Sequence, residues 1–118
     1  MNRERHSYYD SHQRNREHAM IYSSSMWQKT REEVMHKFDG IDVYKFIMKD
    51  VVVPATIVHH ITPLEDDESL KYKTDNCIPV SASSHYEIHR AYDLGGEDKK
   101  RMQETLHFCA SEYLKNYC

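Results

Sequence analysis

With 118 residues, 39% of them hydrophobic, the chain can form one domain with a modest core. No apolar run approaches the ~20 residues that span a bilayer, and from the polar start Met1–His6 we expect no secretory signal peptide. The three cysteines lack paired spacing, which indicates a reducing compartment, so we expect a cytoplasmic protein. The 16 basic and 19 acidic residues give a net charge of -3, unlike the basic footprint of a domain that grips nucleic acid alone.

The first part of the chain, residues 1–20, is polar and has no apolar periodicity. Such a composition predicts a flexible N-terminal segment. His6, His12 and His18 recur in it at intervals of six residues. This recurrence fits a weak metal-binding tract, but a solvated tail or a frayed helix is the favoured interpretation.

A helix is predicted next, with Ser24 or Ser25 as its N-cap. Residues spaced three and four apart predict one buried stripe along it. The stripe consists of Trp27, Thr30, Arg31, Val34 and Phe38. The pair Asp39–Gly40 is a typical helix end.

The middle of the chain favours β structure. Residues 43–48 fit either a strand or a short helix, because periodicity does not separate the two. Residues 50–54 begin a β element that continues as a strand rich in β-branched residues over 55–61. A polar loop leads to a second strand over residues 74–80, interrupted by Pro79.

The last part of the chain predicts two helices. Ser81, Ser83 or Ser84 caps the first, and Gly95–Gly96 marks a hinge before the second, which covers residues 97–117. The expected organisation is a polar segment at residues 1–20, a folded domain at 21–94 and a C-terminal helix packed on it at 95–118.

Four of the nine histidines form two close pairs. His85 and His89 are four residues apart, so on a helix both imidazoles lie on one face, one turn apart, and can bind one metal ion. A third histidine from a neighbouring strand would complete a three-histidine site. His59 and His60 are adjacent, so on a strand they point to opposite sides. One of them can face the metal, and the other is left as a free imidazole of the kind that phosphate-ester hydrolysis requires.

The order of these residues resembles that of the HNH, or ββα-metal, endonucleases: a histidine pair, then Asn76, then two histidines at a spacing of four. The flanks agree. Ile21–Arg31 resembles the lead-in segment of phage and bacterial HNH proteins, and Val53–Pro63 resembles their P-A-x-x-V-H-H-I-x-P strand and turn. The resemblance covers about residues 20–92 and implies an α+β fold. In that fold a ββα-metal core, the HNH nuclease domain at 21–94, is flanked by N-terminal and C-terminal helices.

The resemblance also implies the roles of single residues. His60 would be the general base, and Asn76 would hold the loop after His60 in register. The implied metal ligands are His59, His85 and His89. Neutral nitrogen donors favour one divalent ion of the Zn²⁺, Ni²⁺, Co²⁺ or Mn²⁺ type over Mg²⁺. The candidate phosphate contacts are Lys29, Arg31 and Arg90.

One departure from the family concerns a structural zinc. Many relatives hold it with two Cys-x-x-Cys pairs, whereas this chain has Val43 and Phe46 in place of the first pair and Ser81 and Ser84 in place of the second. The ligand types exclude a structural four-cysteine zinc. Val43 and Phe46 suggest that an apolar contact replaces it.

Two functions remain open. The first is a metal-dependent DNA endonuclease of phage or mobile-element origin, acting through one metal ion and one histidine base and leaving 5′-phosphate and 3′-hydroxyl ends. The second is a non-catalytic HNH-like module that binds a metal and docks on DNA or a protein. The acidic net charge allows two ways of holding DNA. Either the metal and a few local cations contact the phosphates, or a larger partner, such as packaging machinery, holds the DNA.

Overall fold

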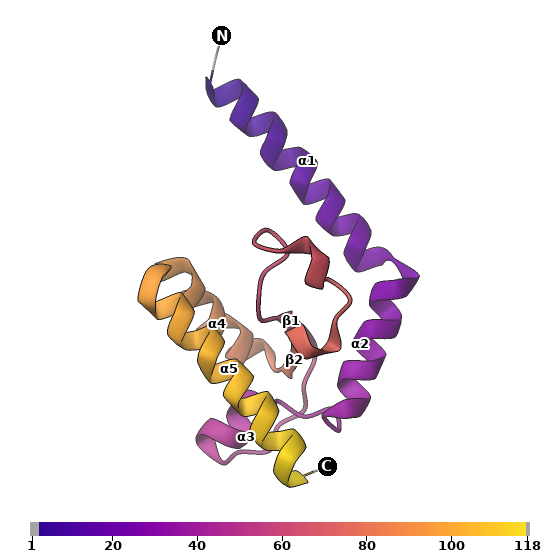
Figure 1. The fold of residues 1–118 in the computed structure, drawn as a ribbon, viewed down its shortest axis with the longest axis vertical. Coiled ribbons are helices and arrows are strands. Elements are labelled where there is room, and N and C mark those ends of the chain that lie inside the picture. Colours follow the sequence, from indigo (N-terminus) through magenta and orange to yellow (C-terminus); the bar gives the residue numbers. More distant parts are fainter. Residues whose placement is uncertain (1–2, 118) are drawn as a thin grey trace.

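The computed structural model describes the backbone of residues 3–117 and the side chains of residues 13–117. A two-stranded sheet lies at the centre, with α2 on one side and α4 and α5 on the other (Figure 1). This arrangement confirms the α+β class. The elements, in chain order, are α1 (Arg3–Ser23), α2 (Ser25–Lys37), α3 (Val43–Lys49), β1 (Ile57–His60), η1 (Glu68–Leu70), η2 (Thr74–Asn76), β2 (Cys77–Val80), α4 (Ala82–Leu94) and α5 (Gly96–Tyr117).

The sheet is one antiparallel pair, in which His59 stands opposite Ile78 and His60 opposite Cys77. Because side chains alternate along a strand, the two histidines leave β1 on opposite faces. α4 follows β2 directly, and its N-cap is Ser81, whose side chain accepts a hydrogen bond from the backbone N–H of Ser84. β1, β2 and α4 therefore form a ββα unit.

Helix α2 has the cap and the buried face that its sequence predicts. Ser24 is the N-cap, and its hydroxyl accepts a hydrogen bond of 3.1 Å from the backbone N–H of Trp27. Of the expected stripe, all members but Arg31 are buried; Arg31 is half-buried, and its guanidinium donates a hydrogen bond to the carbonyl of Thr56. Asp39 and Gly40 both have positive φ, 59° and 67°, which ends the helix.

The β structure is shorter than its sequence predicts. Residues 43–48, left open between strand and helix, belong to the helix α3, whose N-cap is Asp42. Residues 50–56 form no strand: Asp50 has a left-handed backbone that ends α3, and Pro54 makes a single bridge to Ile41. The apolar residues of 43–48 fit both a strand and a helix. The position of this segment in the tertiary structure therefore determines that it forms the helix α3.

The N-terminal segment is helical in the described residues, and a frayed helix is one of the two interpretations that its sequence favours. Helix α1 projects from the junction with α2 away from the rest of the chain (Figure 1). Only Ser24 separates the two helices, and residue 20 lies inside α1. The side chains of His6 and His12 lie outside the described part. None of the helices within residues 3–117 combines the length and apolar composition of a membrane span.

Asp42 ties α3 to the start of α4, in the region where relatives are expected to carry zinc ligands. Its carboxylate is fully buried. One oxygen accepts from the backbone N–H of Lys45 at 2.8 Å, and the other accepts from the N–H and hydroxyl of Ser81 at 2.9 and 2.6 Å. Val43 is also fully buried, and the Phe46 ring meets the ring of Tyr113 edge-on at 5.7 Å. Apolar packing and a buried carboxylate therefore hold α3 in place.

Replacing Asp42 with alanine should lower the free energy of unfolding by about 3 kcal/mol. The substitution leaves three partly buried donors, on Lys45 and Ser81, without their acceptor. Asp42→Asn keeps one carbonyl oxygen and should lose less. Urea denaturation measures both, with Asp67→Ala as the control, because Asp67 caps only an exposed turn. A loss below about 1 kcal/mol for Asp42→Ala would show that the carboxylate does not hold α3.

Candidate active site

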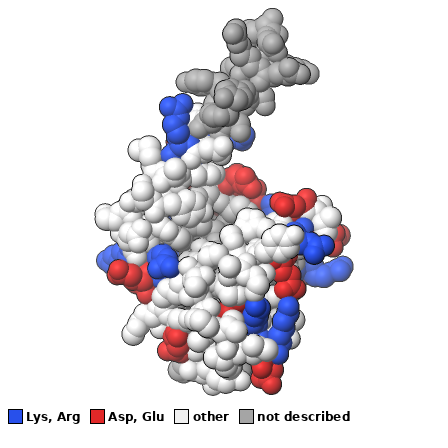
Figure 2. Space-filling model, turned by 180° about the vertical axis from the view of Figure 1, so that it is seen from behind, with Lys and Arg blue, Asp and Glu red and all other residues white. Residues whose placement is uncertain are grey.

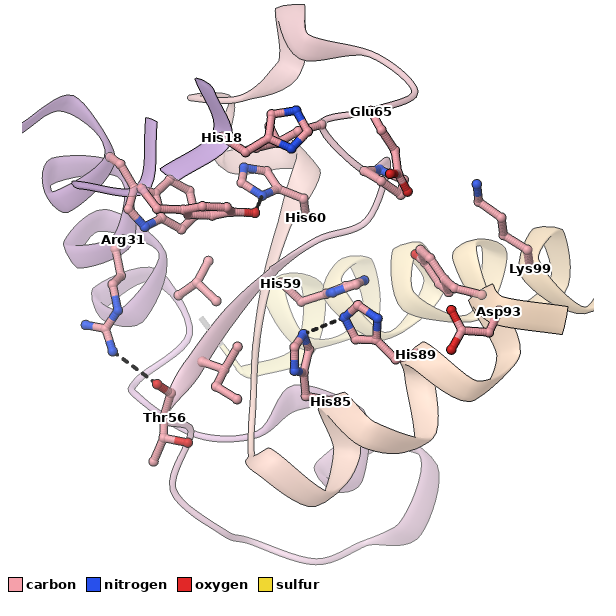
Figure 3. A pocket seen from close by; sticks show the side chains of 17 residues that line it. His18, Arg31, Thr56, His59, His60, Glu65, His85, His89, Asp93 and Lys99 are labelled. Atoms are coloured by element: carbon pink, nitrogen blue, oxygen red, sulfur yellow. Dashed lines mark hydrogen bonds between the residues drawn. The ribbon is translucent and has the colours of Figure 1, made fainter. Parts of the chain in front are cut away.

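A cavity of about 620 Å³ lies between the α1–α2 junction, β1 and α4. All four histidines of the two sequence pairs line it, although they come from β1 and α4. In Figure 3, His59, His85 and His89 point toward one another, and His60 lies apart from them beside His18. The fold therefore separates a three-histidine cluster from one further histidine within a single cavity.

The three-histidine cluster fits a metal ion. One imidazole nitrogen from each of His59, His85 and His89 lies within 4.8 Å of the other two. The Nε2 atoms of His85 and His89 are 2.9 Å apart. Two ligands at right angles and ~2.1 Å from one ion are about 3.0 Å apart, close to this separation. Nε2 of His59 is buried and has no hydrogen-bond partner among the described residues. A buried polar atom without a partner costs free energy, and a metal ion at the centre of the cluster would remove that cost.

The electrostatics of the cluster keep His59 and His85 in their neutral form. Burial, and then the neighbouring His85 and His89, lower the pKa of His59 to about 3. Burial and His89 also lower the pKa of His85. Both imidazoles are therefore neutral at pH 7, which is the state that binds a cation.

The metal-free protein should lose stability as the pH falls from 6.5 toward 3. In that range His59 binds a proton in the unfolded chain, where its pKa is near 6.5, but not in the folded chain. Because the unfolded state binds more protons, the free energy of unfolding should drop by about 2 kcal/mol between pH 7.5 and pH 5. Urea denaturation in EDTA at both pH values measures this. His59→Asn should remove the contribution of about 2 kcal/mol that His59 makes to this drop, and the exposed control His36→Asn should leave the drop unchanged. An equal drop in His59→Asn and wild type would contradict the assignment.

His60 is held on the opposite face of β1. Its ring stacks on Trp27, with centroids 4.7 Å apart and planes at 29°. Its Nε2 lies 2.9 Å from the backbone carbonyl of Lys71, and its Nδ1 lies 3.3 Å from the hydroxyl of Tyr22. A carbonyl only accepts, so Nε2 carries the proton and Nδ1 keeps the lone pair. Burial lowers the pKa of His60 and the contact with the Lys71 carbonyl opposes that shift, so the ring is neutral at pH 7.

Asn76 and two α4–α5 residues hold the backbone that follows β1. The Asn76 side chain is buried, and its amide accepts from the N–H of Thr62 at 2.8 Å and donates to the carbonyl of Thr62 at 3.0 Å. Tyr92 and Gln103 both donate to the carbonyl of Ile61, at 2.5 and 3.1 Å. These bonds fix the turn that begins directly after His60.

The fold is similar to the crystal structure of the HNH endonuclease of deep-sea thermophilic bacteriophage GVE2 with manganese ion, with a TM-score of 0.64 and 30% sequence identity. The similarity covers 86% of this chain and 98% of that one. The chain belongs to the HNH endonuclease family. Comparison of the sequence with protein-family profiles and with curated proteins gives no match.

The HNH assignment confirms the family and the fold that the sequence resemblance implied. It also bears on the metal, because the related HNH structure contains manganese and this chain has a histidine cluster able to hold a metal.

Only one of the three candidate phosphate contacts of this HNH chain lies at the cavity. Arg31 lines the cavity, and its guanidinium donates to the carbonyl of Thr56 at 3.2 Å. Lys29 and Arg90 are exposed and do not line it. Lys99, from the first turn of α5, also lines the cavity and forms an ion pair with Asp66 at 2.6 Å. No pattern in the sequence predicted this location of Lys99.

Proposed function

We propose that this HNH protein is a metal-dependent endonuclease that hydrolyses DNA phosphodiester bonds. The proposal depends above all on one observation. The histidine cluster, with the unpartnered Nε2 of His59, shares a cavity with His60, which stays outside the cluster and keeps a lone pair on Nδ1. A purely structural four-ligand site would recruit the additional histidine.

In this proposal His59, His85 and His89 hold one divalent ion. When bound, the ion supplies Lewis-acid chemistry that polarises the scissile phosphate and stabilises the departing 3′ oxygen. The manganese in the related structure makes Mn²⁺ the first ion to test. Zn²⁺, Ni²⁺ and Co²⁺ also suit three neutral nitrogen donors, and Mg²⁺ suits them least.

His60 acts as the general base. Its Nδ1 accepts a proton from a water molecule as the water oxygen bonds to phosphorus, and the 3′ oxygen leaves, which gives 5′-phosphate and 3′-hydroxyl ends. The Nε2–H bond to the Lys71 carbonyl sets the tautomer and stabilises the imidazolium that forms. Asn76 fixes the turn after His60 and so keeps the base in register.

Because the chain carries a net charge of -3, the proposal includes a partner protein that holds the DNA. Lys and Arg side chains are interspersed with Asp and Glu on the face shown in Figure 2. Arg31 and Lys99 are the cations that line the cavity, and Lys99 is paired with Asp66. A larger protein, such as packaging machinery, would then present the DNA.

The isolated chain should therefore bind DNA weakly and with a shallow salt dependence. The slope of log K against log salt is about 0.9 per neutralised phosphate, so we expect a slope of about 2 in magnitude. Fluorescence anisotropy with a labelled duplex, in Ca²⁺ to prevent cleavage, measures it from 50 to 200 mM salt. A slope near 6 or above would reveal a basic surface that needs no partner.

Plasmid nicking tests the function directly. Supercoiled plasmid should be relaxed by the wild-type chain with Mn²⁺, and EDTA should stop the reaction. End-labelling of the products should find 5′-phosphates. Metal binding without nicking, for Mn²⁺, Zn²⁺, Ni²⁺ and Co²⁺ alike, would favour the alternative, a non-catalytic module.

A further inference from the structure

The surroundings of His60 leave one side of its ring available for chemistry. Trp27 covers one ring face, and the Lys71 carbonyl occupies Nε2. Among the described residues, the polar group within hydrogen-bond reach of Nδ1 is the hydroxyl of Tyr22, at 3.3 Å. A water molecule that gives its proton to Nδ1 must therefore also meet this hydroxyl.

The ring of Tyr22 is held, but not tightly enclosed. It meets Trp27 edge-on, with centroids 5.4 Å apart and planes at 84°, and it lines the cavity. Its residue is 44% exposed, in contrast to 5% for Trp27 and for His60. If one water molecule forms hydrogen bonds of about 2.8 Å to both Nδ1 of His60 and the Tyr22 hydroxyl, these two atoms lie roughly 4.5 to 5.5 Å apart. A shift of the hydroxyl by about 2 Å from its present position makes this space.

We propose that Tyr22 orients the attacking water. Its oxygen accepts one O–H of the water while Nδ1 of His60 accepts the other, which leaves an oxygen lone pair free to point at phosphorus. In the reaction, the proton on the His60 side moves to Nδ1, and the water oxygen bonds to phosphorus as the bond between phosphorus and the 3′ oxygen breaks. The 3′ oxygen then takes a proton from solvent, and Tyr22 keeps its own proton throughout. This role rests on the proposed function and adds a residue from α1 to it.

Two features of Tyr22 agree with this role. Burial raises its pKa above the ordinary value of 10, so the hydroxyl stays protonated at the pH of the reaction and does not compete with His60 as the base. The residue also lies in the last turn of α1: only Ser24 separates α1 from α2, and the Ser24 hydroxyl donates a hydrogen bond to the carbonyl of Ile21 at 2.6 Å. The position of the Tyr22 backbone is thus tied to the N-cap of the helix that carries Trp27.

The test is Tyr22→Phe, which removes the oxygen and keeps the ring. We expect kcat for plasmid nicking in Mn²⁺ to fall by about 10- to 100-fold, with KM for DNA and Kd for Mn²⁺ unchanged. Tyr113→Phe is the matched control, because Tyr113 also donates a hydrogen bond, to Asp39, but does not line the cavity. Its kcat should stay within about twofold of wild type. The emission of Trp27, the single tryptophan, should be the same in Tyr22→Phe as in wild type if the rings keep their packing.

A second readout needs neither metal nor activity. The ¹⁵N chemical shift of His60 Nδ1 in the metal-free protein should change in Tyr22→Phe and not in Tyr113→Phe. An unchanged or increased kcat in Tyr22→Phe, or an unchanged Nδ1 shift, would overturn the role of Tyr22 alone, provided that the wild type nicks plasmid. A wild type that nicks nothing would overturn the proposed function, and the role of Tyr22 with it.

Discussion

Replacing His60 with alanine should lower kcat for plasmid nicking by about 10³-fold or more and leave Mn²⁺ affinity near that of the wild type. General-base catalysis contributes about 10² to 10⁴ in rate. His60 points away from the histidine cluster, and its two ring nitrogens are engaged by Lys71 and Tyr22. Loss of the ring should therefore affect the water and not the ion. Single-turnover cleavage and calorimetric titration with Mn²⁺ measure the two quantities separately.

His107→Ala provides the matched control for that experiment, because His107 is exposed on α5 and does not line the cavity. It should change neither quantity. His60 also stacks on Trp27, so thermal unfolding of His60→Ala must show a folded chain at the assay temperature. A loss of Mn²⁺ affinity equal to the loss of activity would mean that His60 is a ligand and that the base lies elsewhere.

Replacing His89 with alanine should raise Kd for Mn²⁺ by about 100-fold or more and reduce cleavage in parallel at subsaturating metal. The substitution removes one of three protein ligands, so the ion loses a large share of its binding free energy. His89 is exposed on the cavity side of α4, so its loss leaves the core intact. His85→Ala should behave in the same way, because the two Nε2 atoms stand 2.9 Å apart.

The control for the ligand variants is His36→Ala on α2, an exposed histidine outside the cavity. High Mn²⁺ concentration should restore part of the cleavage by His89→Ala but none of that by His60→Ala, because only the first defect is one of affinity. Unchanged Mn²⁺ affinity in both His85→Ala and His89→Ala would place the metal at another site.

Local rules predicted much of the fold. The caps at Ser24 and Ser81 depend on hydrogen bonds within three residues, and the shared face of His85 and His89 depends on helix periodicity alone. These local rules did not predict the structure of the segment that begins at Val43, because a short run of apolar residues fits both the helical period and the strand period. Its outcome as helix α3 depends on Asp42, which joins α3 to Ser81, 39 residues further along the chain.

The surroundings of His60 could not be predicted for the same reason. Its partners Tyr22 and Lys71 lie 38 residues before it and 11 after it, and Lys71 contributes only a carbonyl oxygen, which every residue has. Lys99 reaches the cavity from α5, whose packing against α4 no local pattern specifies. Sequence motifs therefore named candidate ligands and a base, whereas the groups that orient them come from tertiary structure.

The most direct test is a crystal structure of the protein grown with Mn²⁺, with the ion located by its anomalous scattering. We expect one peak, bonded to ring nitrogens of His59, His85 and His89, with His60 outside the coordination sphere and still hydrogen-bonded to the Lys71 carbonyl. A peak that includes His60 among its ligands, or a peak away from this cluster, would contradict the separation of metal site and base on which the proposed function depends.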